Sequence, residues 1–138
     1  MGVNPVAQES MTSRESASDV SDAYLAELFY RLFEKLLYSS LGESAGRAVL
    51  LLLRKSLQQD VGKALWENPK KVYDELLKIF GEGTKVLINI IVFGIKQVCK
   101  LDINSEDFIE LMQSENQNSV EKLRSIMRLI AKSYKEQS

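Results

Sequence analysis

Apolar side chains recur at helical spacing along most of the chain, and this periodicity limits the fold more than any other feature. The first run places its apolar residues at Leu25, Leu28, Phe29, Leu32, Phe33, Leu36 and Leu37. Residues three and four positions apart share one face of an α-helix, so such a run predicts a helix with a buried face. The two prolines, Pro5 and Pro69, interrupt none of the periodic runs. The sequence therefore predicts an all-α fold.

Glycines and capping residues divide the chain into separate helices. Gly42 ends the first run, and Ser44 is the expected cap of a second helix that continues to about Gln58. Asn68 followed by Pro69 is the clearest helix start, and Gly81 is the expected end of that helix. The further segments are a turn at 60–62 with a short segment to residue 66, a core helix over 84–100, a capped helix over 104–112, and a last helix opened by Asn118 and Glu121. We expect a compact bundle of five to six helices, with residues 48–53 buried on all sides.

The first 19 residues differ from the rest in composition. They are rich in serine, glutamine, asparagine and glutamate and have no periodic apolar pattern, which predicts a disordered polar tail over 1–19 and a single helical domain over 20–138. No secretory signal pattern is present, and the most apolar stretch, 86–95, is half of the roughly twenty residues that a membrane span needs. We expect a cytoplasmic protein with no membrane contact.

Two residue counts exclude most catalytic chemistry. The 138 residues include no histidine and one cysteine, which removes Ser-His-Asp and Cys-His catalysis, imidazole metal ligands and intramolecular disulfides. The one thiol, Cys99, shares a predicted helix face with Ile88, Val92 and Ile95, so we expect a core residue rather than a nucleophile. The sequence therefore predicts a protein that is not an enzyme and has no cofactor or metal.

The formal net charge of −1 conceals segments of opposite sign. Residues 101–118 contain five acidic and no basic residues. The order Asp102, Asn104, Glu106 is similar to the start of a calcium-binding loop, but Asp107 stands in the glycine position and Gln113 in the bidentate glutamate position. A solvated, capped helix start explains the same acids. Calcium binding is the weaker of these two hypotheses.

Basic residues gather in two other segments, residues 68–100 and the last helix, each with a formal charge of +3. A turn between two helices can present lysines to a phosphate backbone, which makes a nucleic-acid-associated protein the alternative hypothesis. The residues that would carry it are Lys70, Lys71, Lys78, Arg124 and Arg128.

The stretch 44–92 has a recurring order of elements. A small-residue helix start at 44–46 and a leucine-rich helix precede Asp60 and Asn68-Pro69, and then come Ile79-Phe80-Gly81-Glu82-Gly83 and an aliphatic helix. This order resembles the archaeal nitrosopumilus output domain group of small helical domains, over about half of the chain. Members have no established activity, and some are attached to signalling modules. The resemblance implies an archaeal, cytoplasmic protein that acts by contact and not by catalysis.

The first helix supplies the leading hypothesis for function. Tyr24, Tyr30 and Tyr38 widen its apolar arc beyond what one neighbouring helix covers. We therefore expect a non-enzymatic helical module that binds another protein or a second copy of itself. The candidate contact residues are Phe29, Tyr30 and Phe33, of which at least two are expected to pack in the core.

Overall fold

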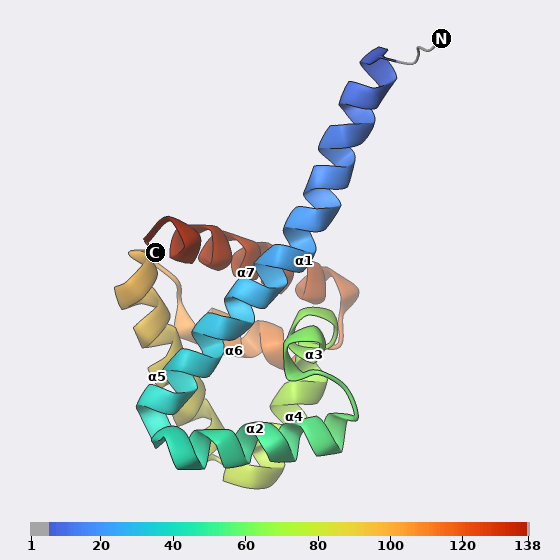
Figure 1. Cartoon of the computed structure of the whole chain (residues 1–138). Helices are drawn as coiled ribbons and strands as arrows, with labels where there is room; N and C mark the ends of the chain where they lie inside the picture. Colours follow the sequence, from blue (N-terminus) through green and yellow to red (C-terminus); the bar gives the residue numbers. More distant parts are fainter. Residues whose placement is uncertain (1–5, 138) are drawn as a thin grey trace.

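The structure, a computed structural model, describes residues 6–137, with side chains described from residue 22 onward. This part of the chain forms seven α-helices and no strand (Figure 1). They are α1 Val6–Leu41, α2 Glu43–Leu57, α3 Val61–Glu67, α4 Pro69–Phe80, α5 Gly83–Cys99, α6 Ser105–Gln113 and α7 Gln117–Gln137. The all-α prediction is confirmed, and the predicted number of five to six helices is too low.

The additional helix is α3, at the place where the sequence predicted a turn. Val61 and Gly62 are its first residues, and Asp60 is its N-cap, with Oδ2 accepting a hydrogen bond from the Lys63 amide at 3.1 Å. A capping side chain stabilises even a short helix because it satisfies an amide that has no partner within the helix. The prediction of a turn at Asp60-Val61-Gly62 was therefore wrong, because these residues begin a helix.

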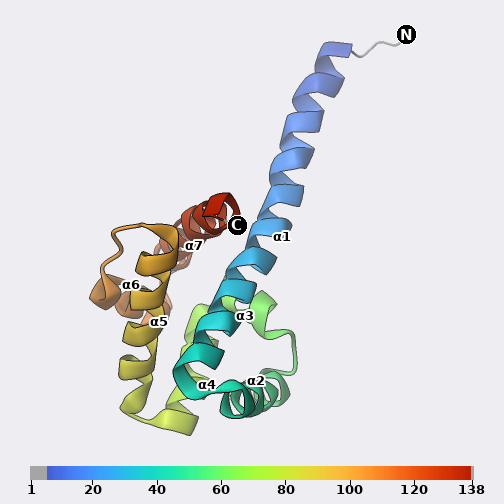
Figure 2. The ribbon, with the colours of Figure 1, turned by 60° about the vertical axis from the view of Figure 1, so that its left-hand side comes forward.

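α1 is the central element of the bundle. Its main contacts are with α2, α3, α5 and α7, and both views show the other helices gathered along its C-terminal half (Figure 2). Leu32 and Leu37 are fully enclosed there. The buried apolar residues between Leu25 and Ala131 form one continuous core. Of the predicted disordered tail at 1–19, residues 1–5 lie outside the described residues, and residues 6–19 belong to the first part of α1, where side chains are not described.

α2 corrects two predictions. Ser44 is not its cap, because the helix begins one residue earlier at Glu43, directly after Gly42, which has a positive φ of 90° and provides no side-chain cap. Residues 48–53 are not buried all round, since Leu51 is 58% exposed while Leu53 is fully buried. The reason is position, because α2 lies at the margin of the bundle and its neighbours α1, α3 and α4 cover one face.

Other helix ends follow the predicted signals closely. Asn68 Oδ1 accepts from the Lys71 amide at 3.4 Å, Asn104 Oδ1 accepts from the Asp107 amide at 2.9 Å, and Gly81 ends α4 with a φ of 57°. The last helix differs, because its side-chain cap is Asn116, whose Oδ1 accepts from the Asn118 amide at 2.7 Å.

No helix of the described residues is long and apolar enough to cross a membrane.

The residue after α2 offers a direct test of backbone strain. Gln58 has a φ of 56°, in the left-handed region that costs a residue with a Cβ about 1 kcal/mol. We expect Gln58→Gly to raise the free energy of unfolding by about 0.5 kcal/mol, after allowing for the greater freedom of glycine in the unfolded chain. Urea unfolding followed by circular dichroism measures the change. Gly81→Ala, the reverse substitution at a positive φ, should lower the free energy of unfolding. A destabilised Gln58→Gly protein would contradict this interpretation.

Candidate functional site

A cleft of about 600 Å³ lies between α1 and α3. Its aromatic lining comes from Tyr30 on α1 and Trp66 on α3, both half-buried, and small residues at Ala23 and Ala26 leave the space open. The volume falls in the range typical of sites that bind a small molecule or a few inserted side chains. The cleft is therefore the leading candidate for a binding site on this chain.

The position of Tyr30 depends on the glycine that it faces across the two helices. A Cβ added to Gly62 would lie 3.0 Å from Tyr30 Cγ and 3.1 Å from Tyr30 Cβ, which is tighter than ordinary van der Waals contact. These atoms are the root of the tyrosine side chain and cannot move without moving α1. Glycine at position 62 therefore lets α3 approach α1 and fixes the inner wall of the cleft.

Polar groups surround the Tyr30 hydroxyl. The hydroxyls of Tyr30 and Tyr38 both donate to Glu34 Oε2, each at 3.4 Å. Burial is the largest cause that raises the pKa of Tyr30 above its ordinary value, and the negative charges of Glu34 and Asp60 raise it further. Tyr30 is therefore a neutral hydrogen-bonding group at physiological pH, and it lies between carboxylates from two different elements.

A neighbouring hollow of about 370 Å³ continues the site toward α2. It shares Tyr30, Glu34 and Asp60 with the cleft and adds Arg47 and Arg54 from α2. The Arg47 guanidinium is already engaged, because it forms an ion pair with Glu43 and lies 6.0 Å from the Tyr38 ring centre. The two hollows therefore share one wall, formed by Tyr30, Glu34 and Asp60.

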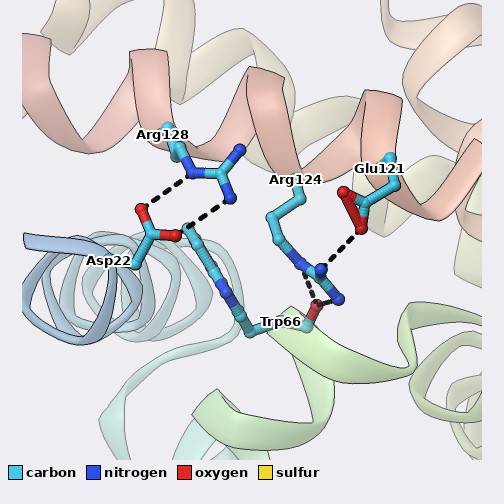
Figure 3. A network of polar contacts seen from close by, with 5 residues as sticks. All are labelled: Asp22, Trp66, Glu121, Arg124 and Arg128. Carbon is cyan, nitrogen blue, oxygen red and sulfur yellow. Dashed lines mark hydrogen bonds and ion pairs between the residues drawn. The ribbon is translucent and has the colours of Figure 1, made fainter. Parts of the chain in front are cut away.

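Arginines of α7 hold the other end of the cleft (Figure 3). Arg128 donates from Nε and Nη2 to the two carboxylate oxygens of Asp22, at 2.9 and 3.0 Å, and its guanidinium lies 5.6 Å from the centre of the Trp66 ring. Arg124 donates from Nε and Nη2 to the Trp66 carbonyl, at 3.1 and 3.0 Å, and pairs with Glu121. We call these two arginines the α7 clamp. It joins α7 to both walls of the cleft.

The three candidate contact residues of the sequence separate into two groups. Phe29 and Phe33 are each 3% exposed and belong to the core, so they present no surface to a partner. Tyr30 lies on the next face of α1 and lines the cleft. The expectation that at least two of the three pack in the core is confirmed.

Most of the cations of the nucleic-acid hypothesis form ion pairs or hydrogen bonds with other residues of the same chain. Lys70 pairs with Asp74 at 2.7 Å, Lys78 pairs with Glu75 at 2.9 Å, and Arg124 and Arg128 form the α7 clamp. Lys71 is exposed and has no ion pair among the described residues. The structure therefore does not bring the five residues together as one free basic surface.

The remaining sequence candidates lie away from the cleft. Cys99 is buried, its thiol is 3.6 Å from the Ile130 carbonyl oxygen, and burial raises its pKa, which keeps it protonated and unreactive. Asp102, Asn104 and Glu106 line a separate hollow next to Lys96. No group of three or more metal-ligating side chains of the kinds His, Cys, Asp and Glu is found in the part of the chain with described side chains.

Sequence reasoning missed the acidic and aromatic partners of Tyr30. Glu34 was not singled out in the sequence, Asp60 was assigned to a turn, and Trp66 was placed at the end of a short segment. The useful local signal was Asp60 itself, a residue type that often caps a helix, and a helix start there would have placed Trp66 on a helix. The approach of α3 to α1 itself has no local signal.

Comparisons with protein-family models, with curated proteins and with solved structures give no match to this chain. The resemblance to the nitrosopumilus output domain group therefore stays a prediction.

Proposed function

We propose that this chain is a non-enzymatic helical module that binds a segment of another protein in the cleft between α1 and α3. The observation that carries the proposal is the half-buried Tyr30–Trp66 lining of an open volume of about 600 Å³. Tyrosine and tryptophan are the residues most often found at the energetic centre of protein interfaces, because they combine a large apolar area with a polar group.

Self-association is the second form of the same function. Light scattering after gel filtration distinguishes the two forms, and we expect a monomer across micromolar concentrations. If the wild-type protein is a dimer and a variant with a blocked cleft is a monomer, the occupant of the cleft is a second copy of the chain. No observation on the described residues favours nucleic acid over protein as the ligand. Lys70, Lys78 and the α7 clamp already pair with acidic or carbonyl groups of the same chain.

A blocked cleft provides the test of the proposed function. Ala23 lines the cleft and is exposed, so Ala23→Phe fills the space without removing a core contact. Ala48 on α2 is exposed but does not line the cleft, and Ala48→Phe is the matched control. Peptides selected from a random display library against the wild-type protein are then assayed against both variants.

We expect the selected peptides to bind wild type and Ala48→Phe alike and to lose about tenfold or more in affinity for Ala23→Phe, the loss typical of blocking a central contact. Peptides that bind Ala23→Phe as tightly as wild type would contradict the proposal. So would peptides that depend instead on Phe93, which is 62% exposed on the outer face of α5.

A further inference from the structure

The cleft is more acidic than the chain as a whole. Five acidic and two basic side chains line it, which gives a formal charge of −3 against −1 for all 138 residues. The acidic residues are Asp22, Glu27, Glu34, Asp60 and Glu67, and the basic residues are Arg31 and Lys63. An acidic cleft favours a cationic ligand, both in the bound state and during the approach of the ligand.

Ion pairs within the chain show which of these acids are available. Asp22 is held by Arg128, and Glu27 pairs with Arg31 on the same helix. Glu34, Asp60 and Glu67 have no ion-pair partner among the residues with described side chains. The available negative charge therefore lies at the centre of the cleft around Tyr30 and along α3.

Two carboxylates beside Tyr30 retain capacity to accept hydrogen bonds. Both phenols donate to the same oxygen of Glu34, Oε2, and the Lys63 amide donates to Oδ2 of Asp60. No described residue donates to Glu34 Oε1 or Asp60 Oδ1. A carboxylate accepts several hydrogen bonds, so each of these two groups can receive further donors from a ligand.

A guanidinium group fits this combination better than an ammonium group. It is planar, it carries five donors that can reach carboxylates on two sides, and it packs on aromatic rings. The chain already uses this pairing at the other end of the cleft, where the Arg128 guanidinium bridges Asp22 and lies against Trp66. Tyr30 with Glu34 and Asp60 offers a second set of the same groups. Neither carboxylate forms an ion pair among the described side chains, and Arg47 and Arg54 line the adjoining hollow rather than the cleft.

We propose that the occupant of the cleft is an arginine-bearing segment of a partner protein, with a guanidinium placed at Tyr30 between Glu34 and Asp60. This inference rests on the proposed function and adds the chemistry of the ligand. The cleft exceeds the size of one guanidinium, and the space lined by Ala23 and Ala26 accommodates the residues next to the arginine.

The one tryptophan of the chain reports directly on the cleft, because Trp66 lines it. The probe is a short peptide with arginines separated by alanines, titrated into the full chain while Trp66 fluorescence is recorded. A matched peptide carries citrulline, which keeps the shape of arginine but has no charge. Spermine supplies positive charge without a peptide.

Two variants locate the binding. Glu34→Gln with Asp60→Asn removes two charges, while glutamine still accepts from the phenols and asparagine still caps α3. Glu106→Gln with Glu110→Gln removes the same charge from exposed positions on α6, away from the cleft. The control therefore matches the change in net charge.

We expect the arginine peptide to change Trp66 fluorescence, with affinity that falls as salt is added. The Glu34→Gln/Asp60→Asn protein should bind about tenfold more weakly, the expected loss for two partly exposed charge pairs, and the α6 control should bind within about twofold of wild type. The citrulline peptide should bind at least about tenfold more weakly than the arginine peptide.

Three results would overturn the inference. They are an equal loss of affinity in the α6 control, equal binding of the citrulline peptide, or spermine binding as tightly as the arginine peptide. If library peptides occupy the cleft but contain no enriched arginine, the proposed function stands and the arginine inference fails. If no peptide that binds wild type loses affinity for Ala23→Phe, both the proposed function and the arginine inference fail.

Discussion

Replacing Leu53 with alanine is expected to lower the free energy of unfolding by about 3 kcal/mol, the middle of the range for a fully enclosed leucine. The same replacement at Leu51, two residues earlier on α2, should change it by less than about 0.5 kcal/mol. Leu53 is fully buried and Leu51 is 58% exposed. The large difference arises because Leu53→Ala removes packed atoms and leaves a cavity, whereas Leu51→Ala removes a side chain that is mostly in water.

The pair of variants controls for helix propensity, because both substitutions replace leucine by alanine in the middle of one helix. Chemical unfolding followed by circular dichroism gives both free energies. Similar losses at the two positions would show that Leu51 is buried in solution. That result would be expected if a partner or a second copy covered the outer face of α2, and light scattering would identify the second case.

Neutralising the α7 clamp is the second change with a large expected effect. Arg124→Met with Arg128→Met should lower the free energy of unfolding by about 3 kcal/mol, because the Trp66 carbonyl loses its side-chain donors and Asp22 loses a two-point ion pair. Methionine retains much of the apolar stem, so the loss measures the polar contacts. Lys85→Met with Lys122→Met makes the same charge change at exposed positions of α5 and α7, and it should cost less than about 1 kcal/mol.

The contribution of Arg128 has a definite pH dependence. Hydrogen bonds from Arg128 are the largest cause that lowers the pKa of Asp22 below its ordinary value of 3.8. Stabilisation by a carboxylate with a lowered pKa is complete above the pKa of the unfolded chain and is lost as the pH falls through the pKa of the folded protein.

The stability difference between wild type and Arg128→Met should therefore be constant above about pH 5 and should shrink as Asp22 becomes protonated. Unfolding curves at a series of pH values measure it. A difference that does not change between neutral and strongly acidic pH would contradict a role for the Asp22–Arg128 ion pair.

Local signals in the sequence were sufficient to predict most of the helices. Asn68 with Pro69, Gly81 and Asn104 each mark a helix end by chemistry that acts within one turn, and the structure has all three. Prediction was wrong where the outcome depended on the neighbours of a helix. Leu51 and Leu53 are the same residue type in the same apolar run, and only the position of α2 at the margin of the bundle decides which of them is buried.

The candidate site was predictable in part for the same reason. Tyr30 was found because it widens the apolar arc of α1, which is a property of one helix. Glu34 was missed although it lies one turn from Tyr30 on the same helix. Asp60 and Trp66 were missed because they reach Tyr30 only when α3 packs on α1 through Gly62. A contact between two helices that are about thirty residues apart leaves no periodic signal in either of them.

The α7 clamp also sets an order of events during synthesis. The Asp22–Arg128 pair closes a loop of 106 residues, so α1 cannot receive this contact until Arg128 has left the ribosome. Local helices such as α4 and α5 can form much sooner. A nascent chain therefore carries both walls of the cleft before α7 has joined them, and the ligand-binding form is expected to appear only after α7 has been synthesised and packed.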